Sequence, residues 1–221
     1  MEPVGDKPTG VQKISAVMNK TRRKWWGEGS WETRKAENET GSEWRQKDGK
    51  PSVRCMLMKS HSTEGITFYT NYSSRKGQEI ADNPQVALLF YWQALYLQVR
   101  IEGKAVKTDP KESEEYFHSR PKSNQLSAAT SNQDEVVESM KVLVKKKDEL
   151  RQKYADQSAV IPKPEDWGGY LVKPDSYEFW YGHADRLHDR IRFRRPFPEE
   201  VPDEKLVHTG EDGWVYEYLS P

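Results

Sequence analysis

The feature that most constrains the fold is a series of strand-like segments in the middle of the chain. Apolar and polar side chains alternate over residues 53–58 and 66–72, a continuous apolar run covers 86–92, and residues 96–106 alternate again. Side chains on a strand point to opposite faces with a period of two, so each alternating segment predicts a strand with one buried face. The spacing predicts a meander whose first two strands are joined by a Gly-containing turn.

Helical signals interrupt the strands. Ser74 is expected to cap a short helix that stops before Pro84, and Asp109 to cap a second helix that runs to Pro121. A longer amphipathic helix is predicted over about residues 134–156. Further strands are then predicted at 170–174, 177–182, 190–195 and 214–219. Strands at both ends around central helices predict a mainly β protein with helices (α+β), in the form of a β-barrel with helical insertions.

Composition excludes several classes of function. Lys plus Arg and Asp plus Glu are both 35, so no global field attracts nucleic acid or an anionic membrane. No apolar run approaches the roughly 18 residues of a membrane span. The single Cys55 excludes an internal disulfide and a multi-cysteine metal site, which suits a reducing compartment. We therefore expect a cytoplasmic protein with no metal site.

Residues 1–47 differ in composition from the rest of the chain. They are polar and highly charged, and their four tryptophans follow neither strand nor helix periodicity. One interpretation is a flexible N-terminal arm, and the other is an arm that docks on a partner subunit through its tryptophans. The remaining residues, 48–221, are expected to form one domain.

Most of the candidate functional residues near the C-terminus are arginines. The segment 189–195 places Arg190, Arg192 and Arg194 on one face of a predicted strand, and Arg186 and His188 join that side if the strand begins early enough. Such a cluster fits a planar anion, but surface salt bridges or nucleic-acid contacts explain it equally well.

Two further sets of polar residues fit anions. Arg75 and Lys76 lie in the first turn of the predicted short helix, where free N–H groups favour phosphate, although an ordinary charged helix start has the same appearance. Tyr116 and Arg120 are one helical turn apart, with Asn124 just beyond.

Several segments in fixed order make a more specific signature. They are SVRCMLMK (52–59), FYTNYSSRKGQE (68–79), YFHSRPKS (116–123), WGGY (167–170), RLHDRIRFRR (186–195) and the ending W-x-Y-E-x-L-x-P (214–221). In this order they resemble the pyridoxamine 5'-phosphate oxidase family over residues 48–221.

The resemblance implies a homodimeric, FMN-binding split β-barrel with FMN in a groove between the subunits. The positions it assigns to the cofactor are Arg54, Met56, Leu57, Tyr69, Thr70, Arg75, Lys76, Gln98, Gln133, Trp180 and Arg190. Those it assigns to the substrate are Lys59, Tyr116, Arg120, Asn124, Arg186 and His188, of which Arg186 and His188 are the catalytic candidates.

The implied activity is oxidation of pyridoxamine and pyridoxine 5'-phosphates to pyridoxal 5'-phosphate, with O2 as the electron acceptor. In such a reaction the flavin supplies the redox chemistry, and the protein holds two phosphates in the correct geometry. The alternative is a catalytically impaired paralogue that binds pyridoxal 5'-phosphate or FMN as a carrier or dimer partner.

Some residues depart from the pattern of the family. Asn124 and Asp134 replace serines, Leu97 and Tyr218 replace arginines, and Tyr181 replaces a glutamine. Asp134 is expected either to repel the flavin phosphate or to turn outward and cap the long helix.

A larger departure concerns the first strand of the barrel. Residues 37–47, ENETGSEWRQK, stand where the family has an alternating apolar strand, so we expect this strand to be missing and a barrel edge to be left unpaired.

Overall fold

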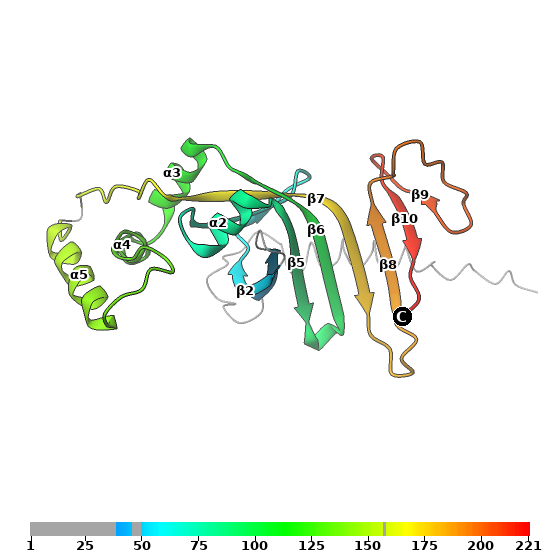
Figure 1. The fold of residues 1–221 in the computed structure, drawn as a ribbon, viewed down its shortest axis with the longest axis horizontal. Helices are drawn as coiled ribbons and strands as arrows, with labels where there is room; N and C mark the ends of the chain where they lie inside the picture. Colours follow the sequence, from blue (N-terminus) through cyan, green and yellow to red (C-terminus); the bar gives the residue numbers. More distant parts are fainter. Residues whose placement is uncertain (1–38, 46–49, 157) are drawn as a thin grey trace, which may run out of the picture. The chain divides into compact units, whose positions relative to one another are not determined.

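The computed structural model describes residues 39–45, 50–156 and 158–221 of the chain. The expected N-terminal arm therefore lies outside the described residues, apart from the segment 39–45. Strands in this part of the chain join one antiparallel sheet in the order β2-β1-β5-β6-β7-β8-β10-β9, with β4 paired to β7 and β3 to β4 (Figure 1). The predicted fold class, mainly β with helices, is confirmed.

The bounds of the elements are as follows. The strands are β1 (Glu39–Arg45), β2 (Pro51–Leu57), β3 (Ser60–His61), β4 (Ile66–Asn71), β5 (Gln85–Trp92), β6 (Leu97–Lys107), β7 (Trp167–Tyr181), β8 (Asp189–Arg194), β9 (His208–Thr209) and β10 (Val215–Tyr218). The helices are α2 (Arg75–Asp82), the short 3-10 helix η2 (Gln93–Leu95), α3 (Pro110–Ser119), α4 (Lys122–Thr130) and α5 (Met140–Lys153). Among the described residues, no helix is long and apolar enough to cross a membrane.

Strand β1 corrects the expectation that the first barrel strand is missing. Its backbone pairs with β2 on one side and β5 on the other, with Gly41 opposite both Cys55 and Leu89. The prediction was wrong because it relied on apolar alternation. A ladder is built from backbone groups, so a polar segment can complete it where neighbouring strands offer free N–H and C=O groups.

The pairing of the next strands also differs from the prediction. β2 pairs with β1, whereas β4 pairs with β3 and β7, so the segments 53–58 and 66–72 are not partners in a hairpin. The Gly-containing turn instead joins β3 to β4, where Gly65 has a φ of 149° and its N–H bonds to the carbonyl of Ser62. The hairpin of β5 and β6 is formed as predicted.

Tertiary packing changes two further elements. The segments 170–174 and 177–182 belong to one continuous 15-residue strand, β7, whose pairing with β6 shifts register between Glu102 and Gly103. The predicted helix over 134–156 begins six residues late, because α5 starts at Met140 after its N-cap Ser139. α2 and α3 follow the predicted caps, Ser74 and Asp109.

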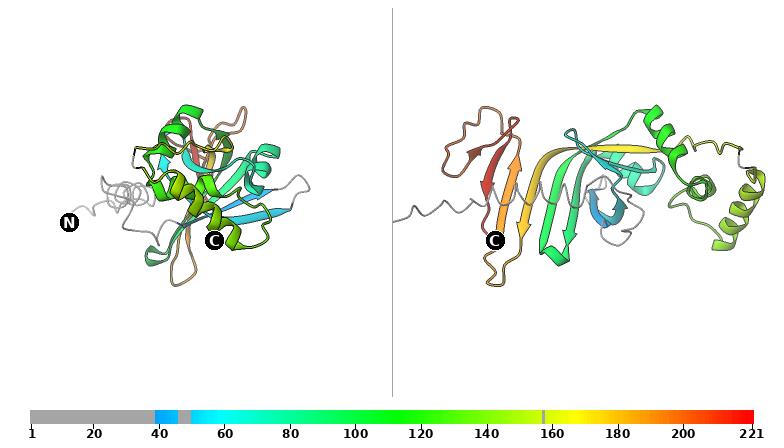
Figure 2. Two further views of the ribbon diagram at one scale, coloured as in Figure 1. Left: turned by 90° about the vertical axis from the view of Figure 1, so that its left-hand side faces the viewer. Right: turned by 180° about the vertical axis from the view of Figure 1, so that it is seen from behind.

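The α3–α4 region has a small core of its own. Phe117, Leu126, Ile161 and Trp167 are buried together, and Tyr69 and Tyr116 pack against them. Figure 2 shows α3, α4 and α5 gathered near the start of β7, while the turn between β7 and β8 lies at the other end of that strand. The helical insertion thus places aromatic side chains beside the end of β4.

Candidate active site

The first group of expected site residues is built at the N-terminus of α2. Ser74 is fully buried; its Oγ donates to the carbonyl of Asn71 (2.6 Å) and accepts from the N–H of Gly77 (3.3 Å). A Cβ at Gly77 would lie 2.2 Å from the carbonyl oxygen of Tyr72, so the helix approaches the end of β4 as closely as only glycine allows. This packing holds the first turn of α2 in place.

Lys76 is the buried cation of this group, with only 3% of its surface exposed. Its Nζ donates to Gln133 Oε1 (2.7 Å) and Thr70 Oγ1 (3.1 Å). Burial lowers the pKa of Lys76 to about 8, against the opposing effect of the nearby Asp134 carboxylate. The structure thus brings together three residues that were expected to bind FMN.

Glu79 forms ion pairs with two arginines of the same group, Arg54 and Arg75. Its Oε1 accepts from Arg75 Nε (2.9 Å) and its Oε2 from Arg54 Nη2 (3.0 Å), and Glu79 itself is 5% exposed. Glu79 was not among the residues predicted from the sequence, although its i,i+4 spacing from Arg75 is a usable signal. On β2, Met56 is half-buried on the same face as Arg54, whereas Leu57 points to the opposite, exposed face.

Asp134 lies at the same helix end. Its Oδ2 accepts the backbone N–H of Arg75 at 2.9 Å, and its φ of 69° places it in the left-handed region. The interpretation that Asp134 caps the long helix is therefore wrong: Ser139 is the N-cap of α5, and Asp134 accepts the first backbone N–H of α2, whose N-cap is Ser74. The carboxylate occupies the position where an anion would meet the positive end of the helix.

The second group surrounds Arg120, the C-cap residue of α3. Its guanidinium lies 4.8 Å from the centre of the Trp167 ring, and Nη2 donates to the carbonyl of Asn124 (3.1 Å). The Nη1 atom is buried and has no hydrogen-bond partner among the described residues. A buried donor without a partner raises the free energy of the folded protein, so Arg120 Nη1 favours binding of a ligand that supplies an acceptor.

Lys59 and Tyr116 complete the second group. Lys59 Nζ lies 5.9 Å from the centre of the Tyr116 ring. Burial lowers the pKa of Lys59 and the Arg120 guanidinium lowers it further, whereas burial raises the pKa of Tyr116. Tyr116 stacks on Tyr69 at 4.0 Å, and Tyr69 is one of the expected cofactor residues. The second group therefore contacts one residue that is expected to bind the cofactor.

The third group lies at the turn between β7 and β8. β8 begins at Asp189, so Arg186 and His188 lie in the preceding loop and do not extend the face of the strand. Arg186 is exposed with a φ of 65°. His188 Nδ1 accepts the backbone N–H of His183 (3.0 Å), and its ring lies 4.7 Å from that of Trp180. A neutral His188 in this arrangement carries its proton on Nε2.

Neighbouring strands align the other expected cofactor residues with this turn. Gln98 on β6 is opposite Trp180 on β7, which is opposite Arg190 on β8. Arg190 donates through Nε and Nη2 to Glu178 Oε1 (2.9 and 2.7 Å), a buried carboxylate that the sequence analysis missed.

The other strand arginines have structural partners. Arg192 pairs with Glu217, and Arg194 pairs with Glu200 and Glu217. For these two arginines the salt-bridge interpretation is correct. Leu97 is buried in the core and Tyr218 lies in an aromatic cluster with His208 and Tyr216, so neither substituted position leaves a gap.

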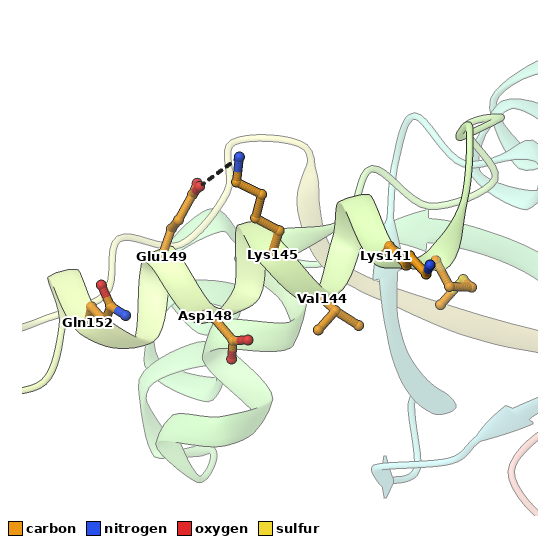
Figure 3. A pocket seen from close by; sticks show the side chains of 7 residues that line it. Lys141, Val144, Lys145, Asp148, Glu149 and Gln152 are labelled. Carbon is orange, nitrogen blue, oxygen red and sulfur yellow. Dashed lines mark ion pairs between the residues drawn. The ribbon is translucent and has the colours of Figure 1, made fainter.

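A pocket of about 550 Å³ lies away from these groups, along α5 (Figure 3). Its lining includes Val144 and the Lys145–Glu149 ion pair, whose atoms are 4.0 Å apart. None of the expected site residues lines it, and we assign it no function.

Comparisons with known proteins agree with this arrangement. A model described as pyridoxamine 5'-phosphate oxidase matches residues 44–154, and one described as the pyridoxine 5'-phosphate oxidase C-terminal dimerisation region matches residues 167–221. The chain belongs to the pyridoxamine 5'-phosphate oxidase family.

Named relatives are similar over most of the chain. A pyridoxine/pyridoxamine 5'-phosphate oxidase of Bombyx mori is 51% identical over 174 residues, which cover 79% of this chain and 68% of the relative. A pyridoxine-5'-phosphate oxidase of Bos taurus is 48% identical over 176 residues, covering 79% and 67%.

Solved structures support the fold. PhzG from Burkholderia lata 383, solved in complex with tetrahydrophenazine-1-carboxylic acid, has a TM-score of 0.75 at 22% identity. The match covers 98% of this chain and 95% of that chain. A pyridoxamine 5'-phosphate oxidase-related, FMN-binding protein from Nostoc punctiforme has a TM-score of 0.64 at 12% identity, with coverage of 98% of this chain and 100% of that chain. The predicted split-barrel fold is confirmed.

FMN is the cofactor of the pyridoxamine 5'-phosphate oxidase family, and the residues present fit it. A buried Lys76 and the arginines Arg54 and Arg75 surround a helix N-terminus, which is the chemistry that a phosphate requires. The Asp134 carboxylate opposes an anion at this helix end, because it accepts the first backbone N–H of α2.

Proposed function

We propose that this chain is an FMN-dependent oxidase that converts pyridoxamine 5'-phosphate and pyridoxine 5'-phosphate to pyridoxal 5'-phosphate, with O2 as the electron acceptor. The observation that carries the proposal is the Arg120 group: its Nη1 atom is buried without a partner among the described residues, and its guanidinium lies over the Trp167 ring, which stacks on Tyr69, a residue expected to bind the cofactor. Bound FMN supplies the acceptor for the hydride that leaves the C4' carbon of the substrate.

The substrate phosphate is assigned to Lys59, Tyr116, Arg120 and Asn124. Burial lowers the pKa of both Lys59 and Arg120, because each charge is partly removed from water, and the Arg120 guanidinium lowers the pKa of Lys59 further. A phosphate between them would relieve both costs and accept the N–H of Arg120 Nη1. The substrate ring is then held beside the Tyr69–Tyr116 stack.

Arg186 and His188 are proposed to act on the pyridine side of the substrate. The backbone N–H of His183 fixes the orientation of the His188 ring, so that Nε2 carries the proton when the ring is neutral. Arg186 is exposed in the same turn and is free to swing toward an anionic ring substituent. Both residues remain candidates for orienting the substrate and moving a proton.

Two observations support a homodimer with the active site between the subunits. Thr70, a partner of Lys76, is opposite Gly168 near the start of β7, whereas Gln98 is opposite Trp180 near its end, so most of the length of β7 separates the Lys76 group from the Gln98–Trp180–Arg190 row within one chain. One FMN meets both only if a second chain supplies one of them. In addition, one face of β2 and β5 exposes the apolar side chains Val53, Leu57, Leu89 and Tyr91.

Two further expectations stay predictions. The boundary between an N-terminal arm and the oxidase domain near residue 47 rests on composition, and a cytoplasmic location rests on the single cysteine of the chain.

The function is tested with the purified full chain. Flavin absorbance after reconstitution with FMN measures cofactor binding, and the formation of pyridoxal 5'-phosphate from each phosphorylated substrate measures turnover. We expect both substrates to be oxidised, with one hydrogen peroxide formed per turnover. FMN binding without turnover of either substrate would favour the carrier alternative, and no FMN binding would exclude the oxidase.

A further inference from the structure

Asp134 is an anion placed where the cofactor phosphate belongs. Its Oδ2 accepts the N–H of Arg75, the first residue of α2, and its charge acts on the buried Lys76. A pocket of about 500 Å³ opens at this point, and its lining includes Arg75, Gln133 and Asp134. One carboxylate thus engages the helix end and the cation that are assigned to the flavin phosphate.

The residue preceding Asp134 links the same loop to the cation. Gln133 Oε1 accepts from both Lys76 and Thr70, so residues 133 and 134 together engage the side chain and the backbone groups of this site. The loop between α4 and α5 carries both residues and is not helical. Its contacts with α2 include the single hydrogen bond of Asp134, which a phosphate oxygen can replace.

We propose that Asp134 is a built-in competitor of the flavin phosphate, so that FMN loading requires its carboxylate to leave the N-terminus of α2. The proposal rests on the proposed function for the identity of the ligand. A phosphate monoester carries nearly two negative charges at neutral pH, so it and the Asp134 carboxylate exclude each other from one helix end. In the cofactor-free protein the Asp134 carboxylate binds the N-terminus of α2, and in the loaded protein the FMN phosphate takes its place.

The experiment compares Asp134→Asn with Glu135→Gln in the full-length protein. Asparagine keeps the size, the acceptor oxygen and the tolerance for a positive φ, but it removes the charge. Glu135 lines the same pocket and bonds to Asn132 rather than to α2, so Glu135→Gln removes an equal charge without touching the helix end. The dissociation constant of FMN is measured from the quenching of flavin fluorescence.

We expect Asp134→Asn to tighten FMN binding about fivefold or more, the floor set by two unit charges about 4 Å apart in water-like surroundings. Glu135→Gln is expected to change it less than twofold. Equal affinities of Asp134→Asn and the unsubstituted protein, or equal tightening by the two substitutions, would overturn the proposal.

A second measurement separates this proposal from the function. Inorganic phosphate is titrated against the cofactor-free proteins, and the midpoint of thermal unfolding is followed. We expect phosphate to raise the midpoint more for Asp134→Asn than for the unsubstituted protein or Glu135→Gln. If no variant binds FMN, the proposed function fails, but the phosphate titration still tests the role of Asp134. A larger rise of the unfolding midpoint in Asp134→Asn supports competition between Asp134 and phosphate, and equal rises in all three proteins refute it.

Discussion

At the scale of single residues, the buried Lys76 predicts how FMN binding depends on pH. Burial lowers its pKa to about 8 from an ordinary 10.5, so the amine is partly neutral just above pH 8 in the cofactor-free protein. A bound phosphate favours the charged amine, and binding at higher pH must therefore take up a proton. We expect FMN affinity to fall as the pH rises through about 8.

Fluorescence titrations of FMN between about pH 7 and pH 9.5 measure this effect, because the phosphate of FMN keeps its charge over this range. Lys76→Arg stays charged throughout and is expected to remove the dependence. An affinity of the unsubstituted protein that does not change with pH would contradict the prediction. The cofactor-free protein should show the converse trend: its low-pKa amine costs stability below about pH 8, and the cost is relieved as the pH rises toward 10.5.

The second prediction at this scale concerns Arg120. Lysine at this position keeps a charge but loses the Nη1 and Nη2 donors and the planar stack on Trp167. We expect Arg120→Lys to raise the KM for pyridoxamine 5'-phosphate about tenfold or more, because a hydrogen bond between charged groups contributes about 1.5–3 kcal/mol.

Steady-state kinetics measure this change, and Arg151→Lys on the exposed surface of α5 is the matched control. A KM for Arg120→Lys within twofold of the control would remove Arg120 from the phosphate site. Loss of kcat alone, with KM unchanged, would place its contribution in the transition state.

At the scale of elements, helix α2 is the part of the fold on which the proposed cofactor site depends. Its Gly77 leaves no room for a Cβ, which would lie 2.2 Å from the carbonyl oxygen of Tyr72. We expect Gly77→Ala to destabilise the protein by about 1–3 kcal/mol and to weaken FMN binding, because the helix must move away from β4.

Chemical denaturation followed by tryptophan fluorescence measures the stability of this variant. Gln78→Ala, at the next and exposed position of α2, is the control and is expected to change stability by less than about 0.5 kcal/mol. Equal stabilities of the two variants would show that the contact between Gly77 and Tyr72 is not tight.

At the scale of the whole molecule, the exposed apolar face of β2 and β5 predicts the oligomeric state. Val53 on β2 is 71% exposed, and Val160, in the segment before β7, is 70% exposed. An aspartate at the centre of an apolar interface leaves a charge without water, whereas the same change at a free surface costs little. We expect Val53→Asp to produce a monomer with weak FMN binding and Val160→Asp to leave a dimer.

Light scattering coupled to size-exclusion chromatography measures the mass in solution. The unsubstituted chain is expected at twice its mass of 25.8 kDa. A monomer that binds FMN fully would contradict the placement of the site between subunits.

The local elements were largely predictable from the sequence. Ser74 and Asp109 mark helix starts with their own side chains, and alternation marked β5 and β6, because caps and periodicity depend on residues close in the chain. The arginines and lysines of the candidate site were proposed on similar grounds, because their chemistry follows from residue type and from the order of short segments.

The tertiary structure alone decided how distant segments pair and which charges meet. Strand β1 has a polar sequence and forms because β2 and β5 both offer backbone partners, which no local pattern records. Glu79 and Glu178 pair with arginines, and Asp134 accepts an N–H of α2 rather than of α5, through contacts between residues that the fold brings together. The sequence was sufficient to predict the family, the helix caps and the candidate residues. The sheet order and the position of the Asp134 carboxylate depend on long-range packing, because the free energy of such contacts depends on neighbours far away in the chain.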